Sequence, residues 1–341
     1  MRSTMMTSST MMTTTATTMT SIVVVPNSAG GMTPDVASVS YDAYASGYDV
    51  IDGGAIASYV GIDDARSSLL GDPNLVHGRV LEVGVGTGLN LEYYYPGLFD
   101  RGGIDDGIVS LTLVDVSGGM LDAARERWES MLMMTSDVGG GGGRRGRRGG
   151  GADGVPSVEF VKADATTQLT STFGASSFDV AIDTFGLCVM GDEGARMCLR
   201  EMTDVVRRGG YVLLIENTKS SNPLLGYYQD ITASAAASMG GKGSFFFFFS
   251  HSLVFHPSFL SSSSSSPSLL VVVDAPLSPP PGTSRVQLYY FAILNLYRGG
   301  GKGCLYNQDV GRMIRQTEGL RLIREETFAA GFFRSFICQK I

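Results

Sequence analysis

Short runs of apolar residues recur along the chain and alternate with stretches whose apolar positions are spaced three or four apart. Five of these runs are nearly continuous, as in strands that are buried on both faces of a sheet. They span residues 78–85, 110–116, 158–164, 178–185 and 211–217. Alternation of such strands with helices predicts an α/β fold with a doubly wound, mostly parallel sheet.

Two amphipathic helices and a hairpin complete this pattern. The first helix is predicted after Ser117, a residue type that caps helix N-termini, and it carries an apolar stripe at helical spacing. The second precedes the fifth strand, and we expect it to end at the glycine pair Gly209 and Gly210. The tail, residues 320–341, predicts two strands joined around Gly331, which brings the sheet to seven strands.

Three stretches differ in composition from the rest of the chain. They are the Met-, Ser- and Thr-rich segment 1–36, the Gly- and Arg-rich segment 138–152, and segment 241–300 with its runs of Phe, Ser and Pro. Low-complexity stretches of these kinds are not expected to pack. We therefore predict one folded domain over 37–240 and 301–341, with a flexible Gly/Arg loop and a low-complexity insertion over 241–300. The tetrapeptide GGKG stands at both ends of the insertion, which favours this interpretation.

The N-terminal segment has no acidic residue before Asp35 and is rich in hydroxyl side chains. This composition is typical of organellar transit peptides and predicts a mitochondrial or plastid location. A disordered or mis-started N-terminus on a cytoplasmic protein is the alternative. The apolar runs of 241–300 are broken by His251, His256 and Pro257, so no transmembrane helix of about 20 residues fits there. Peripheral membrane contact is the most that this segment predicts.

Charge and cysteine content exclude several classes of function. The formal net charge is -7, whereas nucleic-acid binders carry a dominant positive field. Only the arginines within 144–148 favour an RNA-binding protein. The four cysteines, Cys188, Cys198, Cys304 and Cys338, form no CxxC pair, so we expect no metal site and no disulfide framework.

Three alternating glycines, Gly84, Gly86 and Gly88, directly follow the first predicted strand. Ligands of open α/β sheets bind beyond the carboxyl ends of the strands, and glycine lets the backbone approach a ligand closely. A dinucleotide fingerprint, GxGxxG, would need glycine where Leu89 stands. Asp115, at the end of the second strand, suits a carboxylate that accepts both hydroxyls of a ribose. A plain tight turn and a helix-capping carboxylate are the structural alternatives.

The run from Glu82 through the three glycines, Asp115, and the KADA segment with Asp164 resemble the class I S-adenosylmethionine-dependent methyltransferases. The resemblance implies S-adenosylmethionine as the cofactor and a role for each motif residue. The implied contacts are Glu82 with the amino-acid end, Gly84, Gly86 and Gly88 with the methionine part, Asp115 with the ribose, and Asp164 and Ala165 with the adenine. Tyr48, in YDAYASGYD, stands where the family closes over the cofactor.

A narrower resemblance concerns DTFGLC at 183–188, GCLYN at 303–307 and the terminal hairpin. These are similar to a subgroup that holds thiol-methylating methyltransferase-like proteins and a fungal mitochondrial inner-membrane methyltransferase, although this chain has Leu305 and Tyr306 where the subgroup has GCxWN. The subgroup implies a small or lipophilic acceptor of the thiol or phenol/quinone type. Such acceptors ionise partly by themselves; a less acidic hydroxyl would need a base, for which Asp183 is the candidate. A structural acid at Asp183 is the alternative.

Rival functions remain open on the sequence. The chain could bind the cofactor and methylate poorly, because the segment expected to cover the acceptor is the most altered. A nicotinamide-dependent oxidoreductase would need a completed dinucleotide loop and a proton-relay residue, and the sequence shows neither. The partner expected is a small-molecule acceptor, with no nucleic acid and no metal.

Overall fold

The computed structural model describes residues 31–45, 48–49, 57–58, 60–94, 107–137, 156–223, 225–227, 229–230 and 304–341. The Gly/Arg loop 138–152, the insertion 241–300 and residues 1–30 of the N-terminal segment lie outside the described residues. Helix α1 begins at Pro34, inside the segment 1–36, with Thr33 as its N-cap.

One seven-stranded sheet organises the described chain, in the order β3-β2-β1-β4-β5-β7-β6. The strands are β1 (Gly78–Val83), β2 (Ile108–Asp115), β3 (Ser157–Lys162), β4 (Phe178–Thr184), β5 (Val206–Asn217), β6 (Leu320–Phe328) and β7 (Phe333–Lys340). Strands β1 to β5 pair in parallel, whereas β7 pairs antiparallel with both β5 and β6. The predicted doubly wound sheet with a C-terminal hairpin is therefore confirmed. The carboxyl ends of β1, β2 and β4 meet at one edge of the sheet.

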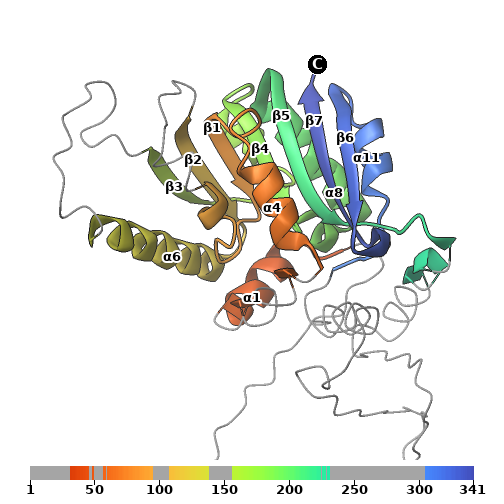
Figure 1. Cartoon of the computed structure of the whole chain (residues 1–341), viewed down its shortest axis with the longest axis horizontal. Coiled ribbons are helices and arrows are strands. Elements are labelled where there is room, and N and C mark those ends of the chain that lie inside the picture. The colour runs from red at the N-terminus through yellow and green to blue at the C-terminus, as the bar shows by residue number, and fades with distance from the viewer. Residues whose placement is uncertain are drawn as a thin grey trace, which may run out of the picture.

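Helices cover both faces of the sheet (Figure 1). They are α1 (Pro34–Tyr44), α4 (Ile62–Leu70), α6 (Gly118–Asp137), α7 (Leu169–Phe173), α8 (Leu187–Val205) and α11 (Val310–Gln316), and the short 3-10 helix η2 (Ala329–Gly331) joins β6 to β7. Helices α7, α8 and α11 pack on one face, and α4 and α6 pack on the other. Among the described residues, no helix is both long enough and apolar enough to cross a bilayer.

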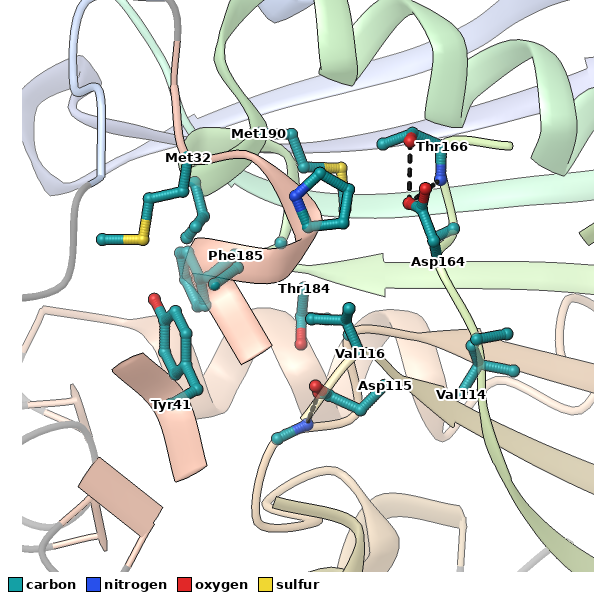
Figure 2. A pocket seen from close by; sticks show the side chains of 18 of the residues that line it. Met32, Tyr41, Val114, Asp115, Val116, Asp164, Thr166, Thr184, Phe185 and Met190 are labelled. Atoms are coloured by element: carbon teal, nitrogen blue, oxygen red, sulfur yellow. Dashed lines mark hydrogen bonds between the residues drawn. The ribbon is translucent and has the colours of Figure 1, made fainter. Parts of the chain in front are cut away.

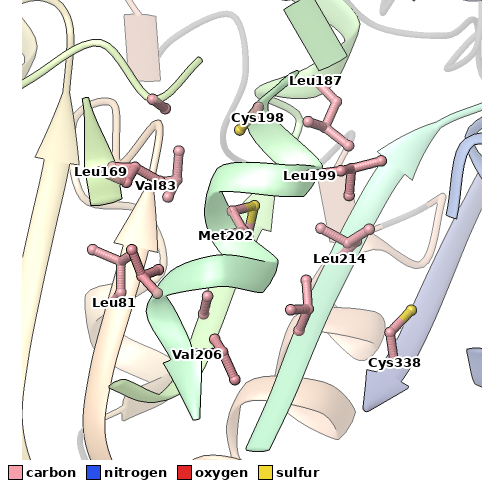
Figure 3. Packing of buried hydrophobic residues seen from close by; sticks show 14 of the residues in the cluster. Leu81, Val83, Leu169, Leu187, Cys198, Leu199, Met202, Val206, Leu214 and Cys338 are labelled. Carbon is pink, nitrogen blue, oxygen red and sulfur yellow. The ribbon is translucent and has the colours of Figure 1, made fainter. Parts of the chain in front are cut away.

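The core follows from the continuous apolar runs of the strands. On one face, α8 places Cys198, Leu199 and Met202 against Leu81 of β1 and Leu214 of β5 (Figure 3). All five side chains are fully buried. Because each strand must present apolar residues to helices on both faces, its sequence shows no polar alternation, which explains why the runs could be recognised as buried parallel strands.

Two local predictions had different outcomes. Ser117 caps α6 as predicted, because its Oγ accepts a hydrogen bond from the N–H of Met120 at 3.1 Å. The predicted helix end at Gly209 and Gly210 is wrong: α8 ends at Val205, and the glycine pair lies in a bulge of β5. A Cβ on Gly210 would stand 2.4 Å from the carbonyl oxygen of Asp179, so the glycine serves a close approach of two strands rather than a helix end.

Candidate functional site

A cavity opens at the carboxyl edge of the sheet, where β1, β2 and β4 end (Figure 2). It encloses about 760 Å³ of empty space, a volume that includes open solvent. The residues that line it are Met32, Pro34, Ala37, Tyr41, Tyr48, Gly84, Gly86, Val114, Asp115, Val116, Ala163, Asp164, Ala165, Thr166, Thr184, Phe185, Gly186, Val189 and Met190.

The glycine loop forms part of the cavity wall. Gly84, Gly86 and Gly88 all have positive φ, at 64°, 56° and 81°, which side chains rarely tolerate. Gly84 and Gly86 line the cavity, whereas Gly88 does not. A Cβ on Gly88 would lie 2.8 Å from Leu91 and 3.3 Å from Ala124 of α6. Gly88 therefore permits close packing of the loop on α6, and its contact with the methionine part of the cofactor stays a prediction.

Asp115 joins the end of β2 to the glycine loop. Its Oδ2 accepts a hydrogen bond from the N–H of Gly86 at 2.9 Å, and its Oδ1 accepts one from the N–H of Ser117 at 2.8 Å. Burial raises the pKa of Asp115, and the two backbone hydrogen bonds oppose that rise. Each oxygen keeps a further lone pair, so the carboxylate can still accept the hydroxyls of a ligand.

Asp164 lies after β3 on another side of the cavity from Tyr41 (Figure 2). Its Oδ1 accepts hydrogen bonds from the N–H and Oγ1 of Thr166, at 2.8 and 2.7 Å, and its Oδ2 accepts one from Thr167 at 2.7 Å. The carboxylate thus stabilises the turn that leads into α7, as in the capping alternative. Together with Ala165 it also lines the cavity, so a structural role and a binding role are compatible.

The entry segment with Tyr48 is tied to the loop and to α6 by two carboxylates. Asp42 accepts hydrogen bonds from Ser117 Oγ at 2.6 Å and from the N–H of Gly119 at 2.8 Å. Asp49 accepts one from Thr87 Oγ1 at 2.5 Å and pairs with Arg127 of α6. These contacts hold α1 and Tyr48 over the cavity.

Two tyrosines face the cavity from this segment. The rings of Tyr41 and Tyr48 lie 6.4 Å apart. Burial raises the pKa of both phenols well above the usual value, so both stay neutral at pH 7. Tyr41 was not among the predicted site residues, although it stands in the same short motif as Tyr48.

Glu82 lies beneath the glycine loop, outside the cavity lining. It is 1% exposed, and its Oε1 accepts a hydrogen bond from Asn90 Nδ2 at 2.8 Å. The same amide nitrogen donates to Oγ1 of Thr184, which does line the cavity, at 2.8 Å. Burial raises the pKa of Glu82 to about 7, and the Asn90 hydrogen bond opposes the rise. Glu82 is therefore connected to the cavity lining through Asn90 and Thr184, and its direct contact with the amino-acid end of the cofactor stays a prediction.

Asp183 is fully buried and does not line the cavity, as the structural alternative expects, and its contact with a substrate stays a prediction. Its side chain lies against Glu216 at the end of β5, beside the N-terminus of α8. A Cβ on Gly186 would stand 2.2 Å from Asp183 Oδ1, and one on Gly84 would stand 3.6 Å away. Asp183 is thus directly behind two glycines of the cavity wall. No local pattern indicates a role for Glu216, because a whole helix separates it from Asp183 along the chain.

Phe185 follows β4 with a φ of 63°, unusual for a bulky residue. Its N–H donates to the carbonyl of Ile215 at 2.9 Å, and its ring packs edge-on against Phe333 at 5.7 Å. The guanidinium carbon of the buried Arg66 lies over the Phe185 ring, 5.9 Å from the ring centroid. Backbone strain of this kind persists where the surroundings fix it, often at binding sites.

The structure brings six of the nine predicted site residues to one cavity. They are Tyr48, Gly84, Gly86, Asp115, Asp164 and Ala165. Among the described residues no cluster of His, Cys, Asp and Glu could hold a metal ion, and all four cysteines are free thiols.

The sheet order with its antiparallel β7 and the cavity at its carboxyl edge define the class: the chain has the class I methyltransferase fold. Residues 81–214 match the family model described as Methyltransferase domain. The match runs from β1 into β5 and includes the glycine loop, Asp115 and Asp164. Comparison with the curated proteins gave no match.

Three solved structures are similar to the chain. The YcgJ protein from Bacillus subtilis has 18% identity and a TM-score of 0.34, over 49% of this chain and 56% of its own. A putative methyltransferase from Bacillus halodurans has 18% identity and a TM-score of 0.34, over 49% of this chain and 57% of its own. A SAM-dependent methyltransferase from Methanosarcina mazei has 16% identity and a TM-score of 0.42, over 78% of this chain and 93% of its own. The chain thus spans less than two thirds of the length of the first two. Likenesses this distant say nothing about the activity of this chain.

Proposed function

We propose that the protein transfers a methyl group from S-adenosylmethionine to a small, lipophilic acceptor of the thiol or phenol/quinone type. The observation that carries the proposal is the convergence of the glycine loop, Asp115, Asp164 and Tyr48 on one cavity. That cavity lies within the segment that matches the methyltransferase family model, apart from its lining by the N-terminal residues.

The residues present fit this cofactor. The φ of 56° at Gly86 favours glycine, and a Cβ there would stand 4.0 Å from Tyr48, so bare loop backbone faces the tyrosine ring. Asp115 would hold the ribose hydroxyls, because its carboxylate is fixed in place by two backbone N–H groups. The adenine would contact the apolar side chains of Val116, Ala165 and Met190, and Asp164 would accept a hydrogen bond from its amino group.

The bound cofactor supplies an activated methyl group on a sulfonium, so the protein has mainly to align and shield the reactants. Tyr41 stays neutral and can donate a hydrogen bond but cannot act as a base at pH 7. Asp115 and Asp164 are engaged by backbone and threonine donors. On this proposal the ribose and the adenine of the cofactor occupy Asp115 and Asp164, and no other lining residue of the described chain is a carboxylate or a histidine that could remove a proton from an alcohol. This favours an acceptor that ionises by itself, as thiols and phenols do.

The lining near α1 and α8 supports a lipophilic acceptor. Met32, Pro34 and Ala37 face Val189 and Met190 with apolar side chains. The N–H of Met32 donates to the carbonyl of Val189 at 2.8 Å, which fixes this wall. An apolar wall excludes water and favours apolar acceptors over charged ones.

Calorimetry with S-adenosylmethionine, S-adenosylhomocysteine and NADH tests the cofactor. We expect binding of the first two and none of NADH; the reverse result would identify an oxidoreductase and overturn the proposal. Incubation with a labelled methyl donor and panels of thiols, phenols and aliphatic alcohols then tests the acceptor by mass spectrometry. Cofactor binding without transfer to any thiol or phenol would refute the acceptor class while leaving the cofactor assignment intact.

A further inference from the structure

Two carboxyl groups lie buried together behind the cavity wall. Asp183 at the end of β4 and Glu216 at the end of β5 are both 0% exposed. Glu216 Oε1 accepts a hydrogen bond from the N–H of Leu187, the first residue of α8, at 2.9 Å. Glu216 Oε2 and both oxygens of Asp183 have no such partner in the described chain. Two buried carboxyls in contact, with only backbone N–H groups at the start of α8 as donors beside them, are stable only when they share a proton.

The pair lies directly behind the backbone that forms part of the cavity wall. Asp183 Oδ1 stands 2.2 Å from where a Cβ of Gly186 would be and 3.6 Å from where one of Gly84 would be. Both glycines line the cavity. Only backbone therefore separates the pair from a ligand, and the low dielectric of the core leaves its field poorly screened.

We propose that Asp183 and Glu216 are specificity-determining residues that favour a cationic ligand in the cavity over its neutral counterpart. On the proposed function, on which this inference rests, that means S-adenosylmethionine over S-adenosylhomocysteine, which differ by the positive charge on sulfur. A positive charge beyond the glycines stabilises the ionised pair. Binding of the cation therefore releases the shared proton from the pair to solvent. Binding of the ligand with the neutral sulfur releases a smaller fraction of a proton.

The pH dependence has a definite sign. Burial raises the pKa of Asp183 to about 6, and burial and the neighbouring Asp183 raise that of Glu216 well above its usual value. As the pH rises through this range the pair becomes more negative, so affinity for the cation should rise. A shift of one pKa unit on binding corresponds to about a tenfold change in affinity.

Other titratable groups lie near the pair, and their titration must be distinguished from that of the pair. Cys188 and Cys198 of α8 and Cys304 lie near it. A hydrogen bond with Cys304 and burial raise the pKa of the Cys188 thiol, and burial raises that of the Cys198 thiol, so both stay neutral. Arg334 of β7 lies opposite Glu216 in register, but its guanidinium binds Glu325 at 2.6 Å. The charge of Asp183 contributes to the raised pKa of Glu82 of β1, which hydrogen-bonds with Asn90 and Tyr94 beneath the glycine loop.

The test is calorimetry of the full chain with both ligands, in two buffers of different ionisation enthalpy, from pH 5.5 to 8.5. We expect S-adenosylmethionine to release more protons than S-adenosylhomocysteine, and its relative affinity to rise about tenfold over this range. Equal proton release, or a pH-independent affinity ratio, would overturn the inference while leaving the cofactor assignment intact. Binding of neither ligand would overturn both.

Two variants assign the effect to its residues. Glu216→Gln keeps an oxygen that can accept from Leu187, and it should abolish the difference in proton release; Asp183→Asn serves the same purpose if the first variant folds poorly. Glu82→Gln is the comparison, because Glu82 also titrates near neutrality, and it should keep the difference. The opposite pattern would assign the effect to Glu82 and overturn the inference.

Discussion

The carboxylate of Asp115 and the backbone N–H of Gly86 are joined by a hydrogen bond of 2.9 Å. The bond links the end of β2 to the loop after β1, two segments that are neighbours in the sheet. It fixes the loop at Gly86, which lines the cavity, and it orients the carboxylate at the cavity. Structural and binding roles therefore meet in one side chain.

The first prediction follows from that bond. Asp115→Ala should weaken S-adenosylmethionine binding by about 10- to 100-fold, because hydrogen bonds to a charged group contribute about 1.5–3 kcal/mol. Asp122→Ala is the matched control: Asp122 is an exposed acid of α6 whose only described ion pair is with Arg125. Calorimetry gives the affinities, and circular dichroism checks the fold. Unchanged affinity of the Asp115 variant would remove this residue from the site.

The second prediction concerns the close approach of Gly186 to Asp183. Gly186→Ala should destabilise the protein by about 1–3 kcal/mol, because the new Cβ would stand 2.2 Å from a buried carboxyl oxygen. Gly118→Ala, at the start of α6, meets no atom closer than 3.8 Å and should be neutral or slightly stabilising. Urea unfolding measures both, and equal stabilities of the two variants would contradict this account of Gly186.

Much of this arrangement could be predicted from the sequence, because local patterns encode it. The buried strands carry continuous apolar runs, and Gly84, Gly86 and Asp115 stand directly at strand ends, where open α/β sheets bind ligands. The predicted helix end at Gly209 and Gly210 is wrong because a glycine pair after an amphipathic stripe has the same local pattern whether it ends a helix or forms a bulge.

The remaining features depend on contacts that no local pattern encodes. Glu216 meets Asp183 only because β5 pairs with β4 after a whole helix. Likewise, the exclusion of Glu82 from the cavity depends on its partner Asn90, which lies on the far side of the glycine loop. An acid next to a strand end is equally compatible with a cavity contact and with a buried pair.

The third prediction is a pH dependence of stability. Burial raises the pKa of Glu82 to about 7 in the folded protein, above its ordinary value of about 4.3 when unfolded. The folded state then binds more protons between these values, so stability falls as the pH rises through this window. Glu82→Gln should remove this loss. The difference in the free energy of unfolding between the variant and the wild type should therefore be more favourable to the variant at pH 8 than at pH 4.5, by on the order of 2–3 kcal/mol.

Urea unfolding at the two pH values checks the Glu82 prediction. Glu129→Gln changes an exposed acid of α6 and is the matched control. Its free energy of unfolding should differ from that of the wild type by the same amount at both pH values. A Glu82 variant that also differs from wild type equally at both pH values would show that Glu82 does not titrate in this window.

The last prediction concerns the segments on either side of 231–303. Gln229 Nε2 donates to the carbonyl of Tyr306 at 2.7 Å, and Asn307 Nδ2 donates to Asp230 at 3.4 Å. The N–H of Lys219 also donates to the carbonyl of Gln308, at 2.9 Å. The chain thus leaves and re-enters the fold at adjacent points, as it does around inserted segments.

We propose on this ground that 241–300 is an insertion that the fold does not need. A variant that lacks these residues keeps 231–240 and 301–303 as a linker, which is ample for ends this close. It should unfold cooperatively and bind S-adenosylmethionine within about twofold of the full chain, a difference of about 0.4 kcal/mol. Gln229→Ala in the full chain is the informative comparison, because it breaks the junction while keeping the insertion, and it should cost more stability than the deletion. Loss of cofactor affinity on deletion would instead make 241–300 part of the site.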